Sequence, residues 1–101
     1  MSILKKKAKI FKALADPIRL QILELLRSGE KCVCEIISHI NFPQPVISRH
    51  LKILKNCGIV KDRHLGNKRL YSITDYSIFN VIDAIDEKLI NSLTKHVIEA
   101  I

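Results

Sequence analysis

The chain has 101 residues, of which 48% are hydrophobic and 27% charged, and its formal net charge is +7. This mixture excludes a disordered chain, and three cysteines are too few, and odd in number, for a disulfide scaffold. No stretch approaches the roughly 20 apolar residues of a membrane span, and the N-terminus has no run suited to a signal peptide. We therefore expect a single domain over residues 1–101, cytoplasmic, with reduced thiols and no membrane partner.

The positive charge is concentrated in the first three quarters of the chain. Residues 1–74 hold 15 Lys and Arg against 5 Asp and Glu, whereas residues 75–101 hold 2 against 5. A basic body followed by a mildly acidic segment is typical of a polyanion-binding surface joined to a separate module. The alternative is that the charge only keeps the protein in solution.

Apolar residues at helical spacing predict two helices at the N-terminal end. The first helix carries four such residues: Leu4, Ala8, Phe11 and Leu14. The second helix begins at Asp16-Pro17, because aspartate is a common N-cap and proline suits the first helical position. It ends before Gly29, which is a stop signal for a helix.

The next segment predicts a helix-turn-helix. A short helix fits residues 32–40, Asn41-Phe42-Pro43 interrupts it, and a further helix runs over residues 44–57. The buried stripe of this further helix consists of Ile47, Leu51 and Leu54. Its opposite face is polar and consists of Pro45, Ser48, Arg49, Lys52 and Asn56.

The apolar period changes after residue 60. Two β-like runs over residues 60–73 flank Gly66-Asn67, which predicts a hairpin with a two-residue turn. Its arms carry Lys61, Arg63, His64, Lys68 and Arg69. A long helix is then expected over residues 75–101, with a continuous apolar stripe made of Ile78, Ile82, Ile85, Leu89, Leu93 and Val97.

The predicted fold class is mainly α with a small β-hairpin wing, in the order α-α-α-α-β-β-α. This order is a winged helix-turn-helix, whose second helix enters the major groove of DNA. Glutamine there pairs with adenine, arginine pairs with guanine, and lysine suits phosphate. The predicted DNA-binding residues are Gln44, Ser48, Arg49, His50, Lys52, Arg63, Lys68 and Arg69. For His50 a partly buried histidine is the alternative.

Motifs of catalysis are missing from the sequence. It contains no Gly-rich phosphate loop, no G-x-S-x-G and no paired carboxylates in a pocket-like context. We therefore expect a DNA-binding regulator rather than an enzyme, without an organic cofactor.

Four stretches resemble the ArsR/SmtB family of winged-helix metal-sensing repressors. They are FKALADPIRLQILELL (11–26), CVCEI (32–36), QPVISRHLKILKNCGIV (44–60) and GNKRLYSI (66–73). The resemblance implies a homodimer through the first and last helices, over residues 1–15 and 75–101. It also implies that helix 44–57 reads operator DNA and that an effector relieves repression. The apolar stripe of the last helix agrees independently with a dimer interface.

Cys32 and Cys34 resemble the arsenic-sensing branch, in which a CVC motif holds As(III) or Sb(III) through thiolates. Residues two apart on a helix point about 200° apart, so a shared ligand requires the first turn to unwind, which would weaken DNA binding. The same divergence argues against a direct disulfide. Ile37 stands where a third cysteine is expected, so the third donor is Cys57, an external thiol such as glutathione, or none. The alternative is a pair of inert, half-buried thiols.

Zinc and a redox or persulfide signal are two alternative effectors. Zinc sensors of the family use a D-x-H…H-x-x-[EH] pattern on the last helix, shared across the dimer, and here Asp83, His96 and Glu99 fall at matching offsets. Ile85 replaces the remaining histidine, and His96 could equally be an interface residue. The cysteine pair could also carry a redox or persulfide signal.

Overall fold

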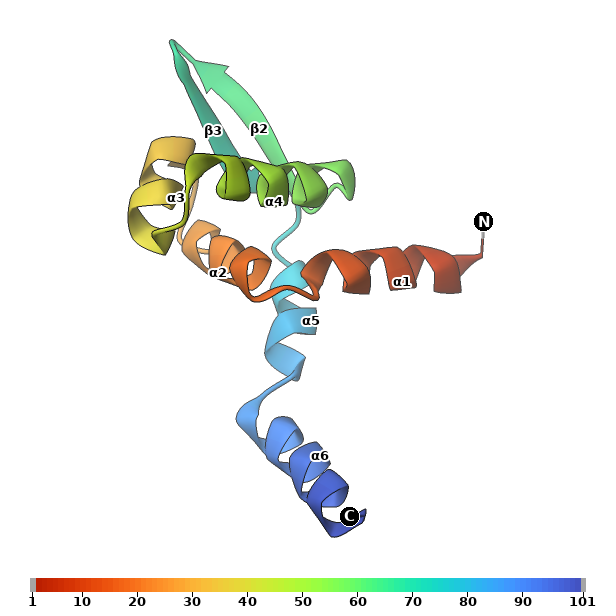
Figure 1. Ribbon diagram of the computed structural model, residues 1–101. Coiled ribbons are helices and arrows are strands. Elements are labelled where there is room, and N and C mark those ends of the chain that lie inside the picture. The colour runs from red at the N-terminus through yellow and green to blue at the C-terminus, as the bar shows by residue number, and fades with distance from the viewer. Residues whose placement is uncertain (1, 101) are drawn as a thin grey trace.

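The computed structural model describes residues 2–100, with side chains placed as far as Ile98. Six helices and three strands lie in this part of the chain (Figure 1). In chain order they are α1 (Ile3–Leu14), α2 (Pro17–Leu26), β1 (Lys31–Cys32), α3 (Val33–Ile40), α4 (Gln44–Asn56), β2 (Val60–Leu65), β3 (Lys68–Ile73), α5 (Ile78–Ala84) and α6 (Glu87–Ala100). The expected mainly helical fold with one hairpin is confirmed.

The core lies between α2, α3, α4 and the sheet. Its largest fully buried side chains are Ile22, Leu23, Leu26, Ile36, Ile47, Leu51, Leu54 and Val60. The predicted buried stripe of α4 is therefore confirmed, and burying it directs the opposite face of α4 to solvent. Packing these Leu and Ile side chains is what fixes α4 on the body.

The start of α2 is capped as its sequence predicts. The Oδ1 atom of Asp16 accepts hydrogen bonds from the backbone N–H of Ile18 at 2.8 Å and of Arg19 at 3.2 Å. Burial alone would raise the pKa of the Asp16 carboxyl, but these two bonds, together with the electrostatic effects of His50 and Arg19, outweigh it and the pKa is lowered. Pro17 is the first residue of the helix, where its missing N–H costs nothing.

The sheet contains a strand that the sequence does not predict. The two-residue β1 pairs antiparallel with β3, with Lys31 opposite Tyr71 and Cys32 opposite Leu70. The strand order is β1-β3-β2. Two residues are too short to show the alternating pattern of a strand, so β1 leaves no signal of its own. It places the first cysteine directly beside the wing.

The prediction of one continuous helix over residues 75–101 is wrong. Helix α5 ends at Ala84, Ile85 leaves the helical region with φ −86° and ψ 78°, and α6 restarts at Glu87. Asp86 stabilises the restart, because its Oδ1 atom accepts a hydrogen bond from the N–H of Leu89 at 2.8 Å. The apolar spacing runs across this break and conceals it.

Helices α1 and α6 project from the body (Figure 1), and these helices and α5 leave much apolar surface uncovered. Leu4 is 72% exposed, and Leu93 and Val97 are each 59% exposed. An apolar surface of this extent usually marks an interaction site. Within the described part of the chain, no helix is long and apolar enough to cross a lipid bilayer.

Candidate nucleic-acid interface and cysteine site

The turn before α4 sets the direction of the helix. Asn41 ends α3 in the left-handed conformation at φ 61° and ψ 43°, which asparagine tolerates better than most residues. Pro43 precedes α4, and Gln44 begins it. In the first two turns of α4, the side chains of Gln44, Ser48 and Arg49 are exposed to solvent, as a DNA-reading helix requires.

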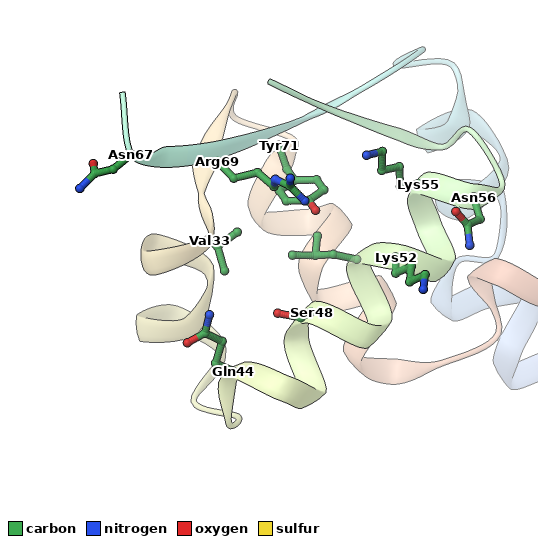
Figure 2. A pocket seen from close by; sticks show the side chains of 10 residues that line it. Val33, Gln44, Ser48, Lys52, Lys55, Asn56, Asn67, Arg69 and Tyr71 are labelled. Atoms are coloured by element: carbon green, nitrogen blue, oxygen red, sulfur yellow. The ribbon is translucent and has the colours of Figure 1, made fainter. Parts of the chain in front are cut away.

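A groove of about 550 Å³ lies between α4, the N-terminal end of α3 and the wing (Figure 2). Its polar lining comes from Gln44, Ser48, Lys52, Lys55, Asn56, Asn67 and Arg69. Figure 2 shows Gln44 and Ser48 on the early turns of α4, and Arg69 reaching in from β3. The structure therefore brings Arg69 of the wing together with five polar residues of α4, which are Gln44, Ser48, Lys52, Lys55 and Asn56.

The cations of this surface fall into two groups. Arg49, Lys52 and Lys68 are exposed, and no ion pair involves them within the described residues. Arg63 and Arg69 are paired with carboxylates that the sequence analysis overlooked. The Arg63 guanidinium donates two hydrogen bonds of 2.8 Å to Glu30, which lowers the pKa of the Glu30 carboxyl.

The second overlooked carboxylate is Asp62 of β2. Its Oδ1 atom lies 3.0 Å from Nζ of Lys55, and its Oδ2 atom lies 3.3 Å from Nε of Arg69. The hydrogen bond from Lys55 holds the pKa of the Asp62 carboxyl below its ordinary value. One signal was available in the sequence, since Asp62 is the single acid in a hairpin arm that is otherwise basic.

His50 does not lie on the exposed face of α4, so its inclusion among the DNA-binding residues is corrected. The side chain is buried, because residue 50 lies on the core side of α4. Its Nδ1 atom lies 3.0 Å from an N–H group of Arg19 and 3.9 Å from Oδ1 of Asp16. His50 thus joins α4 to the start of α2, which agrees with the alternative of a buried histidine.

Cys32 and Cys34 are joined by a disulfide, which contradicts the expectation of two divergent, reduced thiols. The two side chains do not diverge, because Cys32 is not a helical residue. It is the extended N-cap of α3, at φ −76° and ψ 159°, so the pair spans a strand–helix junction with a Cα–Cα distance of 5.3 Å. Cys32 is buried, whereas Cys34 is exposed.

The first cysteine also has a structural role. The Sγ atom of Cys32 accepts a hydrogen bond from the N–H of Glu35 at 3.3 Å, and the Glu35 carboxylate accepts one from the N–H of Cys32 at 3.1 Å. These reciprocal bonds form a capping box, with sulfur in the place of the usual hydroxyl. Any ligand that draws on this sulfur competes with the cap of α3.

A third metal donor is not brought to the cysteine pair. Cys57 ends α4 on the side of α1, with its Sγ atom 3.9 Å from the carbonyl oxygen of Lys9. Among the described residues, no three His, Cys, Asp or Glu side chains are grouped to hold a metal ion. Within the described residues, Cys57 is therefore not placed with the pair as the predicted third donor.

The zinc alternative finds no support in the described residues. Both oxygens of Asp83 are hydrogen-bonded to Arg27, at 2.9 and 2.7 Å, and His96 lies on α6 beyond the break in the helix. The side chain of Glu99 lies outside the described residues.

Comparison with known proteins agrees with this geometry. The family described as "Bacterial regulatory protein, arsR family" matches residues 16–62. An uncharacterized HTH-type transcriptional regulator of Methanocaldococcus jannaschii is 51% identical over 83 residues, 81% of this chain and 93% of that protein. An arsenical resistance operon repressor of Staphylococcus xylosus is 44% identical over 69 residues, 68% of this chain and 66% of the repressor.

A solved structure has the same architecture. The homodimeric winged helix-turn-helix DNA-binding domain of a possible ArsR-family regulator from Mycobacterium bovis superposes with a TM-score of 0.73 at 29% identity. The match covers 98% of this chain and 87% of that one. With the helix-turn-helix, the wing and this extent of identity in agreement, the chain belongs to the ArsR/SmtB family of winged helix-turn-helix transcriptional regulators.

Proposed function

We propose that the protein is a homodimeric repressor that binds operator DNA through α4 and the wing, and that As(III) or Sb(III) releases it by binding reduced Cys32 and Cys34. The observation that carries the proposal is the position of the pair at the junction of β1 and α3. The two sulfur atoms bond to each other there, so after reduction both can reach one thiophilic ion. The relative named as an arsenical resistance operon repressor supports this choice of inducer.

The second copy is proposed to cover α1, α5 and α6, within the dimerisation segments 1–15 and 75–101. The uncovered apolar side chains of these helices support this proposal, and so does the homodimeric relative from M. bovis. Two-fold symmetry would set the two α4 helices against half-sites about one DNA turn apart. Gln44, Ser48 and Arg49 would contact base edges, while Lys52, Lys68 and Arg69 would contact phosphates.

Two contacts give the cysteine pair a physical route to the DNA face. Helix α3, which Cys32 caps, packs against α4. Strand β1 pairs with β3, where Cys32 lies opposite Leu70, and Glu30 just before β1 is bonded to Arg63 of β2. An ion bound by both sulfur atoms would compete with the N–H of Glu35 for Sγ of Cys32, and so would act on the cap of α3 beside the edge of the sheet. DNA affinity falls if the ion binds a form with a disturbed cap more tightly.

The test is fluorescence anisotropy of labelled DNA from upstream of the gene, titrated with arsenite. The protein is reduced with a phosphine instead of a thiol, because monothiols also bind arsenite. Wild type is compared with the variant Cys32→Ser/Cys34→Ser, in which serine keeps a capping oxygen but no soft donor. Release of wild type but not of the variant supports the proposal. Release of both rejects the cysteine site, and release of neither, both without and with added glutathione as the external thiol, rejects arsenic as the inducer.

The disulfide favours a second candidate on the same residues, a redox signal. Oxidation would remove two protons and two electrons from the thiols of Cys32 and Cys34 and join their sulfur atoms. Diamide treatment followed by mass spectrometry and anisotropy tests this candidate. It requires that a loss of 2 Da accompanies loss of operator affinity, and that a phosphine reverses both changes. Unchanged affinity of the fully oxidised protein would reject it.

A further inference from the structure

An ionised carboxylate lies beneath the cations of the groove between α4 and the wing. The side chain of Asp62 is 12% exposed, whereas those of Lys55 and Arg69 are each 46% exposed. Asp62 is therefore largely shielded from solvent, while the two cations bonded to it keep about half of their own side-chain surface exposed. Both cations line the groove, and they come from different elements, α4 and β3 (Figure 2).

This carboxylate changes the surface in two ways. It cancels one of the two positive charges that would attract phosphate, wherever on DNA the protein lies. It also fixes the direction of both side chains, because each cation is bonded to a different oxygen of the same carboxylate. Arg69 is further held by His64, whose Nε2 atom lies 3.0 Å from an N–H group of the guanidinium.

We propose that Asp62 is a specificity-determining residue, which lowers affinity for DNA of any sequence while it orients Lys55 and Arg69 for the phosphates of the operator. The inference rests on the proposed binding of DNA by α4 and the wing, and it is independent of the inducer. In a non-specific complex the two cations act mainly through their total charge. Cancelling one positive charge by Asp62 therefore only weakens binding to DNA of any sequence. In the operator complex, base contacts fix the position of the protein along the DNA. Lys55 and Arg69 are already oriented towards the phosphates there, and this orientation offsets part of the loss in positive charge.

The experiment measures binding of the full chain to its upstream operator and to a scrambled duplex of equal length, over a series of salt concentrations. The variant Asp62→Asn keeps the shape of the side chain and removes its charge. Its affinity for the scrambled duplex is expected to rise roughly three- to tenfold, with a salt slope steeper by about one ion. Operator affinity is expected to rise less, so the ratio of the two affinities falls.

Two controls connect the effect with its cause. Glu24→Gln removes an equal charge from α2, away from the groove, and should leave the ratio unchanged. In a Lys55→Gln/Arg69→Gln background, Asp62→Asn should no longer change the ratio, because the cations on which it acts are gone. Melting curves of each variant establish that differences in affinity are compared between folded proteins.

The outcomes separate this inference from the proposed function. A wild-type protein that does not distinguish operator from scrambled DNA rejects the operator-binding function itself. If wild type discriminates and Asp62→Asn has the same ratio, only the role of Asp62 is rejected. A loss of affinity for both duplexes also rejects it, because the carboxylate would then only support the wing.

Discussion

Arg27 and Asp83 join α2 to α5 through both terminal nitrogens of the guanidinium and both oxygens of the carboxylate, at 2.9 and 2.7 Å. Glu24 accepts two further hydrogen bonds from Arg27, at 3.1 and 2.6 Å, and the guanidinium lies 4.0 Å from the centre of the Phe79 ring. A planar guanidinium suits this combination of a bidentate partner and an aromatic face. The cluster fixes the first C-terminal helix on the helix-turn-helix body.

Replacing Asp83 with asparagine should reduce the stability of the protein in a pH-dependent manner. The Arg27 hydrogen bonds hold the pKa of the Asp83 carboxyl below its ordinary value of 3.8. Because the folded pKa is depressed, the stabilisation is present above pH 3.8 and is lost as the pH falls towards the folded pKa. Urea unfolding from pH 7 to pH 2 should show wild type more stable than Asp83→Asn at neutral pH, with the difference shrinking in acid.

The paired charges are largely exposed, so the effect at neutral pH should be small. Added zinc should not raise the melting temperature of either protein, since Asp83 is already engaged by Arg27. Stabilisation of wild type by zinc, lost in the variant, would contradict the assignment of Asp83 as a structural residue.

Truncating the buried stripe of α4 should be far more damaging. Leu51 is 1% exposed, and Leu51→Ala should lower the free energy of unfolding by about 2–5 kcal/mol through lost burial and a residual cavity. The same truncation at Leu65, which is 56% exposed on the wing, should change it by less than about 0.5 kcal/mol. Equal losses in chemical denaturation would contradict the position of α4 on the core.

Local signals predicted most of the fold. Asp16-Pro17 marks the start of α2, the Gly66-Asn67 turn separates β2 from β3, and Ile47, Leu51 and Leu54 define the core side of α4. The helix break was missed because residues 82, 85 and 89 keep apolar spacing across it. Strand β1 was missed because its stability comes from β3, nearly forty residues later in the chain.

The site was only partly predictable for the same reason. Residue types and helical phase place Ser48, Arg49 and Lys52 on an exposed face, as the structure has them. The carboxylate partners were missed, because the pair of Arg63 and Glu30 joins residues 33 positions apart. The expectation that the two cysteine side chains diverge requires a helical Cys32. Cys32 is instead the N-cap of α3 with an extended backbone, and for this reason the two cysteines can form the disulfide.

Arg49 and Lys68 should contribute to DNA binding in different ways. If Arg49 contacts a base edge, Arg49→Gln costs roughly 1–3 kcal/mol on the operator and relaxes the preference at one position. If Lys68 contacts a phosphate, Lys68→Gln weakens binding to all sequences alike and reduces the salt slope by about one. Anisotropy on the operator and on singly substituted operators measures both. Binding of both variants like that of wild type would contradict the DNA face.

Substitutions of Cys32 should separate its structural role as the cap of α3 from its role in effector binding. In fully reduced protein, Cys32→Ala removes the acceptor for the N–H of Glu35 and should destabilise the fold by roughly 0.5–2 kcal/mol, as loss of an N-cap does. Cys32→Ser restores an acceptor and should recover most of this loss. Both variants lack the thiolate, so both should remain on DNA when arsenite is added.

Cys34→Ala serves as the complementary control for this pair of substitutions. Its side chain is exposed and caps nothing, so the substitution should leave the free energy of unfolding within about 0.5 kcal/mol of wild type while still abolishing the response to arsenite. Urea unfolding in a phosphine buffer gives the stabilities, and anisotropy gives the responses. If arsenite released Cys32→Ser and Cys34→Ala from DNA as it releases wild type, arsenite would act elsewhere on the protein.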